Sequence, residues 1–111
     1  MKPSQGDVVI GPDFIGGSHK RPFIVVNNEN HPFHKEECLV VLVTTTKREE
    51  AIELHDEKFK HGSLPKKSYA SPWTITTIKN SVIKSKVGEL EEEILGKIEQ
   101  DIETYIKVEN S

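Results

Sequence analysis

The stretch that decides the fold is Lys20-Arg21-Pro22-Phe23-Ile24-Val25-Val26-Asn27. Its apolar run is short enough to form a buried β-strand, and one arginine stands where that strand begins. A strand is predicted before it at residues 7–10. Another is predicted after it at residues 39–45, where β-branched residues are dense and the run ends in threonines. An arginine beside a loop and hydroxyl groups at a strand end can together hold a phosphate.

The middle of the chain predicts shorter strands separated by polar loops. Residues 51–55 alternate between apolar and polar side chains, and residues 74–78 are β-branched, so both are expected to be strands. Residues 58–67 are polar and are predicted to be a loop. Pro72 lacks an N–H donor and is expected at a strand start or on an edge strand. Residues 82–87 suggest a last short strand.

Near the C-terminus, apolar residues recur every four positions, at Leu90, Ile94, Ile98, Ile102 and Ile106. This spacing predicts an amphipathic helix of roughly four turns with one apolar stripe. The acidic residues 91–93 fall in its first turn, where the helix dipole favours negative charge. Short strands followed by one helix predict a mainly β fold, either a small β-barrel or a strongly bent antiparallel sheet with a C-terminal helix.

The composition is that of a soluble globular chain. Its 111 residues are enough for one compact domain spanning 1–111, 30% of them are charged, and the mean hydropathy is −0.51. No apolar run approaches the roughly 20 residues that span a bilayer, and no signal peptide is visible. A cytoplasmic protein without membrane attachment is therefore expected. Cys38 is the only cysteine, and it is interpreted as a small buried hydrophobic residue rather than a catalytic thiol.

The negative charge of the chain is concentrated at one end. The formal net charge is −3, but residues 89–111 hold two basic and eight acidic residues, a net charge of −6, which leaves residues 1–88 at +3. A nucleic-acid surface on that larger part is permitted, although it is not required.

These elements and their order resemble the PemK/MazF family of toxin endoribonucleases over nearly the whole chain. The matching pieces are Gly6-Asp7-Val8, Gly17-Ser18, Arg21-Pro22, Ile24-Val25-Val26-Asn27, Val41-Leu42-Val43-Thr44, Ser68 to Ile78, and Gly88-Glu89-Leu90. The resemblance implies an SH3-like barrel that forms a homodimer, binds single-stranded RNA in a groove across the dimer, and is inhibited by an antitoxin protein. It also implies cleavage by attack of the ribose 2′-hydroxyl on the adjacent phosphate, with no metal or other cofactor.

The resemblance assigns roles to particular residues. Arg21 matches the catalytic arginine of the family, and Thr44 matches a threonine whose hydroxyl donates to the same phosphate; Thr45 would serve if the register is shifted by one. Trp73 stands where many members carry an acidic residue, and Ser71 where some carry an arginine. A tryptophan transfers no proton, but it can stack on a base.

A histidine is the expected substitute for the missing acidic residue, because its charge changes near neutral pH. His19, two residues before Arg21, is the first candidate, followed by His34. The residues expected to contact RNA are Lys20, Thr45, Lys47, Arg48, Ser71 and Trp73. No Cys/His cluster has zinc-ligand spacing, so no metal site is expected.

Two other interpretations remain open from the sequence. The chain can be a relative that kept the barrel and lost the chemistry, so that it binds nucleic acid or a protein without cleavage. It can also be an unrelated SH3-like interaction module, although such a module should carry a cluster of exposed aromatic residues. The retained Arg21 and Thr44 favour the nuclease, and Trp73 favours the relative without activity.

Overall fold

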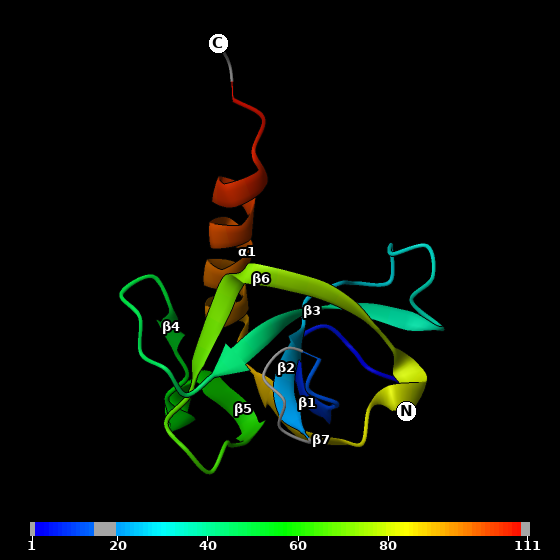
Figure 1. Cartoon of the computed structure of the whole chain (residues 1–111), viewed down its shortest axis with the longest axis horizontal. Coiled ribbons are helices and arrows are strands. Elements are labelled where there is room, and N and C mark those ends of the chain that lie inside the picture. Colours follow the sequence, from blue (N-terminus) through cyan, green and yellow to red (C-terminus); the bar gives the residue numbers. More distant parts are fainter. Residues whose placement is uncertain (1, 15–19, 110–111) are drawn as a thin grey trace.

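A computed structural model describes residues 2–14 and 20–109 of the chain (Figure 1). Their apolar stretches pair into one antiparallel sheet of seven strands, in the order β4-β6-β3-β2-β1-β7-β5, which curls into a half-barrel. The strands are β1 (Asp7–Gly11), β2 (Arg21–Val25), β3 (Glu37–Thr44), β4 (Ile52–Glu53), β5 (Phe59–Gly62), β6 (Tyr69–Lys79) and β7 (Ser85–Leu90). Two 3₁₀ turns, η1 (Asp56–Lys58) and η2 (Asn80–Val82), lie between strands, and the helix α1 (Glu92–Ile106) follows the sheet. The predicted mainly β fold with a C-terminal helix is confirmed.

Strand β3 is buried on both faces, because alternate side chains enter two separate hydrophobic cores. Val41 and Val43 belong to one core, and Val40 and Leu42 belong to the other. Successive side chains of a strand point to opposite faces, so a strand covered on both faces must be apolar at nearly every position. The apolar run at residues 39–43, from which this strand was predicted, follows from burial of both faces.

An irregularity in the pairing of β6 with β3 bends the sheet. Leu42 pairs with Ser71 while its neighbour Val41 pairs with Ile75, so residues 72–74 of β6 fall outside the ladder. Extra residues of this kind bend a strand and increase its twist, and the bend is visible halfway along β6 in Figure 1. On either side of this bend, β6 pairs with β3, and its first residues also pair with β4.

The helix α1 covers the core that contains Val41. Ile94 and Ile98 are buried in that core, and Ile102 packs against it partly exposed. The apolar stripe predicted from the sequence is thus used for packing on the sheet of the same chain. The last turn of α1 projects beyond the sheet (Figure 1), and Tyr105 is exposed there. No helix in the described ranges is long and apolar enough to cross a membrane.

Three local predictions were wrong. Residues 58–67 are not wholly a loop, because β5 forms within them and pairs with β7. Pro72 does not mark a strand start, since β6 begins at Tyr69 and lies between β4 and β3; the proline is tolerated because it falls in the irregular residues that make no ladder bond to β3. Residues 82–83 are not strand: η2 ends at Val82, and β7 begins two residues after Ile83.

The close approach of β5 to β7 depends on Gly62. Its φ is +76°, and a Cβ there would overlap the backbone carbonyl oxygen of Val87. We expect Gly62→Ala to lower the free energy of unfolding by more than about 1 kcal/mol. The matched control is Gly96→Ala, where a Cβ meets nothing within 4 Å on α1 and the free energy should rise by about 1 kcal/mol. Urea unfolding followed by circular dichroism measures both, and equal stabilities of the two variants would contradict this packing.

Candidate active site

A cavity lies where the end of β1, the start of β2 and the end of β3 meet. Arg21 begins β2 opposite Gly11, the last residue of β1. The register of β2 with β3, continued past the pair Phe23 and Leu42, places Arg21 opposite Thr44 at the end of β3. The cavity has a volume of about 310 Å³. Its lining consists of Asp13, Lys20, Arg21, Pro22, Val43, Thr44, Thr45, Lys66 and Ser68.

Arg21 is held in this cavity by two contacts. Its Nη1 lies 3.2 Å from Oδ1 of Asp13, and its Nη2 donates to the backbone carbonyl of Val43 at 3.1 Å. The side chain of Arg21 is 16% exposed and that of Asp13 is 5% exposed, so water and salt screen this pair less than a surface pair. Within the part of the chain that the structure describes, the Nε–H of Arg21 is buried without a hydrogen-bond acceptor. A guanidinium fixed in this way is positioned in advance for an oxyanion.

Thr44 presents a hydroxyl group at the same cavity. Its Oγ1 accepts a hydrogen bond from the backbone N–H of Thr46 at 3.1 Å. That bond uses a lone pair of the oxygen and leaves the hydroxyl hydrogen to be donated elsewhere. Thr45 is exposed and also lines the cavity. The structure thus brings Arg21, Thr44 and Thr45 together in the lining of one cavity.

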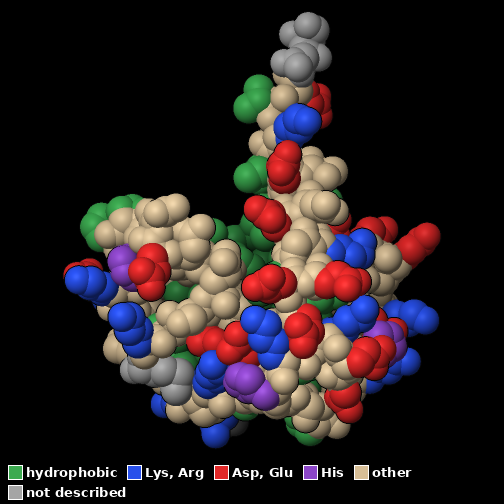
Figure 2. Space-filling view, turned by 180° about the vertical axis from the view of Figure 1, so that it is seen from behind, with side chains coloured by type: hydrophobic (Ala, Val, Ile, Leu, Met, Phe, Trp, Pro, Cys, Tyr) green, Lys and Arg blue, Asp and Glu red, His purple; other side chains and the backbone are tan. Residues whose placement is uncertain are grey.

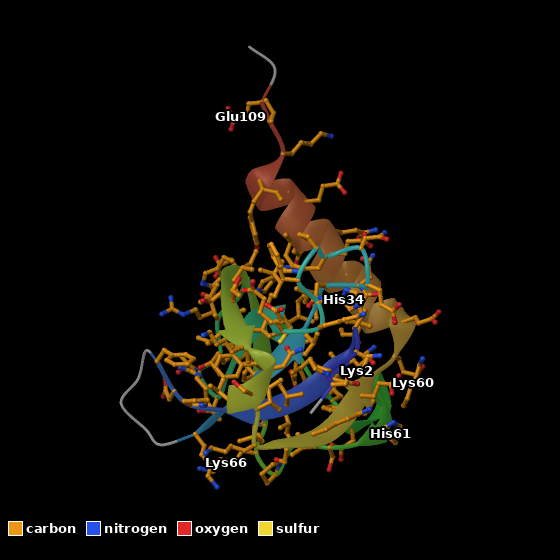
Figure 3. The ribbon with its side chains drawn as sticks, turned by 90° about the vertical axis from the view of Figure 1, so that its right-hand side faces the viewer. Lys2, His34, Lys60, His61, Lys66 and Glu109 are labelled. Atoms are coloured by element: carbon orange, nitrogen blue, oxygen red, sulfur yellow. The ribbon has the colours of Figure 1, made fainter. Side chains whose placement is uncertain are left out.

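Two lysines add positive charge to the cavity. Lys20 and Lys66 line it together with Arg21, and Asp13 is the carboxylate in the same lining. Figure 3 shows Lys66 projecting at the lower end of the molecule. Among the described residues of the lining, three cations and one carboxylate give a net positive charge, which favours an anionic ligand.

Trp73 and Arg48 lie at a different hollow. The hollow has a volume of about 260 Å³. Glu50, which lies in the same loop as Arg48, and Tyr105 of α1 also line it. Trp73 is 40% exposed, so it is available for stacking, but it does not line the cavity of Arg21. Trp73, which the resemblance places at an acidic position, therefore does not share a cavity with Arg21.

Two other residues predicted from the sequence, Ser71 and Lys47, do not line the cavity. Ser71 is buried in β6, 4% exposed. Lys47 is exposed in the segment after β3 and is not among the residues that line the cavity. His19, the predicted proton-transfer residue, lies outside the described residues.

Asp13 is the candidate that the sequence reasoning missed. The signal that would have found it is its place two residues beyond the end of β1, because β1 and β2 pair with Gly11 opposite Arg21. A residue just past one strand of such a pair lies near the start of the next. An acidic side chain at that point was therefore a predictable partner for the arginine.

A second group of charges lies away from this cavity, on β7, β5 and β1. Lys86 Nζ lies 3.0 Å from the buried carboxylate of Asp7, and that hydrogen bond is the main reason why the pKa of Lys86 is raised. Burial favours a higher pKa for Glu89, but the hydrogen bond to His61 and the charges of Lys86 and Lys60 outweigh it, so its pKa is lowered. In Figure 3, Lys60 and His61 lie on the opposite side from Lys66.

The chemistry of the remaining candidate ligands and nucleophiles is simple. Among residues 2–14 and 20–109, no group of three or more His, Cys, Asp or Glu side chains is arranged to hold a metal ion. Cys38 is buried in β3, as predicted. Burial, with a smaller contribution from the charge of Glu37, raises the pKa of the Cys38 thiol to about 11. A raised pKa keeps a thiol protonated at neutral pH, and the thiolate is the nucleophilic form.

The described residues form a small half-barrel with Arg21 in a cavity where three strand ends meet. Residues 4–106 match the sequence model of a family described as PemK-like, MazF-like toxins of type II toxin–antitoxin systems. The chain belongs to this family. No curated protein sequence matches the chain.

Solved structures of two endoribonucleases and of one toxin are similar in fold. An endoribonuclease from a mycobacterial species, in complex with its cognate antitoxin, is 20% identical with a TM-score of 0.74, covering 99% of this chain and 98% of that chain. A mycobacterial endoribonuclease has the same identity and TM-score, with coverages of 100% and 97%. The Mycobacterium tuberculosis toxin MazF-mt6 is 18% identical with a TM-score of 0.73, with coverages of 94% and 99%. At these identities the similarity concerns the fold.

The burial of Cys38 can be tested by its reactivity. Because the thiol is buried and its pKa is raised to about 11, we expect the native chain to react with Ellman's reagent about 100-fold more slowly than the unfolded chain at neutral pH. The chain has one cysteine, so the signal has one source. Rapid labelling of the native protein would contradict the buried position.

Proposed function

We propose that this chain is the toxin of a toxin–antitoxin pair and an endoribonuclease that cleaves single-stranded RNA without a metal ion. Family membership supports the role of toxin, and the similar structures named endoribonucleases support the activity. The observation that carries the proposal is the meeting of Arg21 and Thr44 at one cavity. These two donors come from the ends of adjacent strands, and the family resemblance assigns both to the phosphate that is cleaved.

The proposed reaction is an in-line displacement at phosphorus. The ribose 2′-oxygen loses its proton and attacks the adjacent phosphate, the bond from phosphorus to the 5′-oxygen breaks, and a 2′,3′-cyclic phosphate remains. Negative charge builds up on the non-bridging oxygens, and fixed donors stabilise that charge most effectively. Arg21 offers a charged fork of N–H groups and Thr44 a hydroxyl. His19 remains the proton-transfer residue expected from the sequence.

The lysines of the cavity are proposed to bind the phosphates on either side of the cleaved one. Lys20 and Lys66 line the cavity, and such contacts raise affinity without sequence preference. Trp73 and Arg48, at the separate hollow, are proposed to hold a more distant base and its phosphate. Stacking on an exposed aromatic ring suits any base.

A relative without catalytic activity is the second candidate. Trp73 of β6 favours this second candidate. The resemblance places an acidic residue at that position, and tryptophan cannot transfer a proton. Such a protein would bind RNA at the same cavity and leave it intact. The two candidates therefore differ in cleavage and agree in binding.

An antitoxin protein and a second copy of the chain are the proposed protein partners. Figure 2 shows acidic side chains along the projecting part of α1. Exposed apolar side chains, Tyr105, Ile106 and Val108, lie at the same end. Apolar side chains exposed together at one end of a helix are typical of a contact with another protein. We propose that this end of α1 takes part in the homodimer.

The central test is cleavage of a long single-stranded RNA in EDTA. We expect wild-type protein to give discrete fragments that end in 2′,3′-cyclic phosphate. Arg21→Ala should cleave about 100- to 1,000-fold more slowly, because it removes the charged donors from the developing phosphorane. The matched control is Arg48→Ala, which removes the other arginine of the chain and should mainly weaken binding.

Three outcomes of this assay separate the candidates. Cleavage by wild type and loss only with Arg21→Ala supports the nuclease. Binding without cleavage by wild type supports the relative without activity. Equal cleavage by wild type and a folded Arg21→Ala would show that the cavity of Arg21 is not the active site.

The dimer can be tested by light scattering after size exclusion. We expect wild type to have twice the mass of one chain and Ile106→Asp to shift toward the monomer, because a charge would be buried in an apolar contact. Gln100→Asp, at an exposed polar position of α1, is the matched control and should remain dimeric. A monomeric wild type rules out the proposed dimer.

A further inference from the structure

The hollow beside Trp73 combines two aromatic rings with two opposite charges. It is lined by Trp73 of β6, Tyr105 of α1, and Arg48 and Glu50 from the loop between β3 and β4. Its volume of about 260 Å³ suits one base rather than a folded segment of a protein. Three parts of the fold that are far apart in the sequence therefore meet at one small space.

The two rings of the hollow are open to a flat ligand. Trp73 and Tyr105 are both exposed. Within the part of the chain that the structure describes, neither ring forms a stacked or edge-to-face pair with the other or with a third ring. Trp73 belongs to residues 72–74, which leave the ladder with β3, so the bend of β6 sets its position. A nucleobase presents a π-face and can stack on such a ring.

The two charges of the hollow are available to a ligand as well. Among residues 2–14 and 20–109, neither Arg48 nor Glu50 forms an ion pair with the other or with a third residue. A turn fixes the backbone of their loop, because the N–H of Ala51 donates to the carbonyl of Arg48 at 3.0 Å. An ionised carboxylate accepts hydrogen bonds and donates none, so Glu50 selects a ligand by its donors.

We propose that this hollow binds a guanine base of the RNA and selects it against the other bases. This role rests on the proposed function, because it concerns the base that the nuclease selects. The Watson–Crick edge of guanine carries two adjacent donors, N1–H and the 2-amino group, whereas adenine, cytosine and uracil each place an acceptor beside the donor. The two oxygens of Glu50 match this pair of donors while the base stacks on Trp73. Arg48 offers its guanidinium to the phosphate of the same nucleotide.

The segment after β3 connects this hollow with the cavity of Arg21. Thr45 lines the cavity, and Arg48 and Glu50 further along the same segment line the hollow. Tyr105 lies at the end of α1 that is proposed for the dimer contact, so the hollow borders the groove that the resemblance places across the dimer. An RNA strand that follows this segment places one phosphate in the cavity and one base in the hollow. Cleavage then falls at a fixed number of nucleotides from the guanine.

The test compares single bases in otherwise identical oligonucleotides. A short deoxyuridine oligonucleotide, which lacks the 2′-hydroxyl and cannot be cleaved, carries guanine, hypoxanthine or adenine at its centre. Hypoxanthine keeps N1–H but lacks the 2-amino group. In fluorescence anisotropy, we expect wild type to bind the guanine oligonucleotide about tenfold more tightly than the adenine one, with hypoxanthine between them.

Glu50→Gln separates base recognition from a general effect of charge. Glutamine replaces one acceptor oxygen by a donor, so the preference for guanine over adenine should fall to about twofold or less. Loss of the negative charge alone would change the affinity for all three oligonucleotides alike. The matched control is Glu49→Gln, which removes the neighbouring carboxylate of the same turn; Glu49 does not line the hollow, so the preference should persist. Trp73→Ala should weaken binding of the guanine oligonucleotide by about tenfold.

Cleavage mapping on a long single-stranded RNA separates the guanine site from the proposed nuclease. Wild type should cut at a fixed number of nucleotides from a guanine, and Glu50→Gln should cut at additional sites. A wild type that prefers guanine but does not cleave removes the nuclease and supports the base site.

If wild type cleaves, equal binding of the three oligonucleotides overturns the guanine site alone. So does a preference for guanine that survives in a folded Glu50→Gln, as judged by thermal unfolding. Unchanged affinity of a folded Trp73→Ala also overturns it, and would leave the hollow to a protein partner. Absence of saturable binding to every oligonucleotide overturns both the guanine site and the RNA-binding role.

Discussion

The burial of β3 on both faces is the constraint on which the rest of the structure depends. Because Val41 and Val43 enter one core and Val40 and Leu42 the other, each face of the strand must be covered. The helix α1 covers one face, and the curling of the sheet at residues 72–74 of β6 closes the other. A strand fixed in this way cannot slip by one residue without exchanging its two faces. Its end at Thr44 is therefore held in a defined register opposite the start of β2.

The same register creates the site. Arg21 reaches the carbonyl of Val43 because β2 and β3 are antiparallel neighbours, and Asp13 reaches Arg21 because the chain has just left β1 on the other side. The cavity is thus built from strand ends on a rigid sheet, with the polar groups supplied by adjoining loops. Fixed donors of this kind need little rearrangement when charge develops on a bound phosphate. In the proposed function, this arrangement supplies a pre-organised site for the cleaved phosphate.

Much of the fold could be predicted from the sequence, because several segments have residues with a strong preference for strand or a spacing typical of a helix. The β-branched run in β3 and the four-residue spacing of the stripe that contains Ile94 and Ile98 specify their elements directly. The strand β5 was missed, because three of its four residues are exposed and only its pairing with β7 makes it a strand. The positions of Arg21 and Thr44 at strand ends could be predicted, because each flanks a clear apolar run. Asp13 was not, because its contact with Arg21 exists only after β1 and β2 have paired.

The measurement that tests the central claim most directly is a titration of the protein with a 2′-deoxy analogue of single-stranded RNA, observed by ¹⁵N–¹H NMR. The chain has two arginines and one tryptophan, so the Nε–H signals of Arg21 and Arg48 and the indole signal of Trp73 can be assigned by substitution. We predict that the Nε–H signal of Arg21 moves in proportion to binding, because the phosphate occupies the cavity around its guanidinium. Saturable binding that shifts the signal of Trp73 and leaves that of Arg21 unchanged would contradict the account.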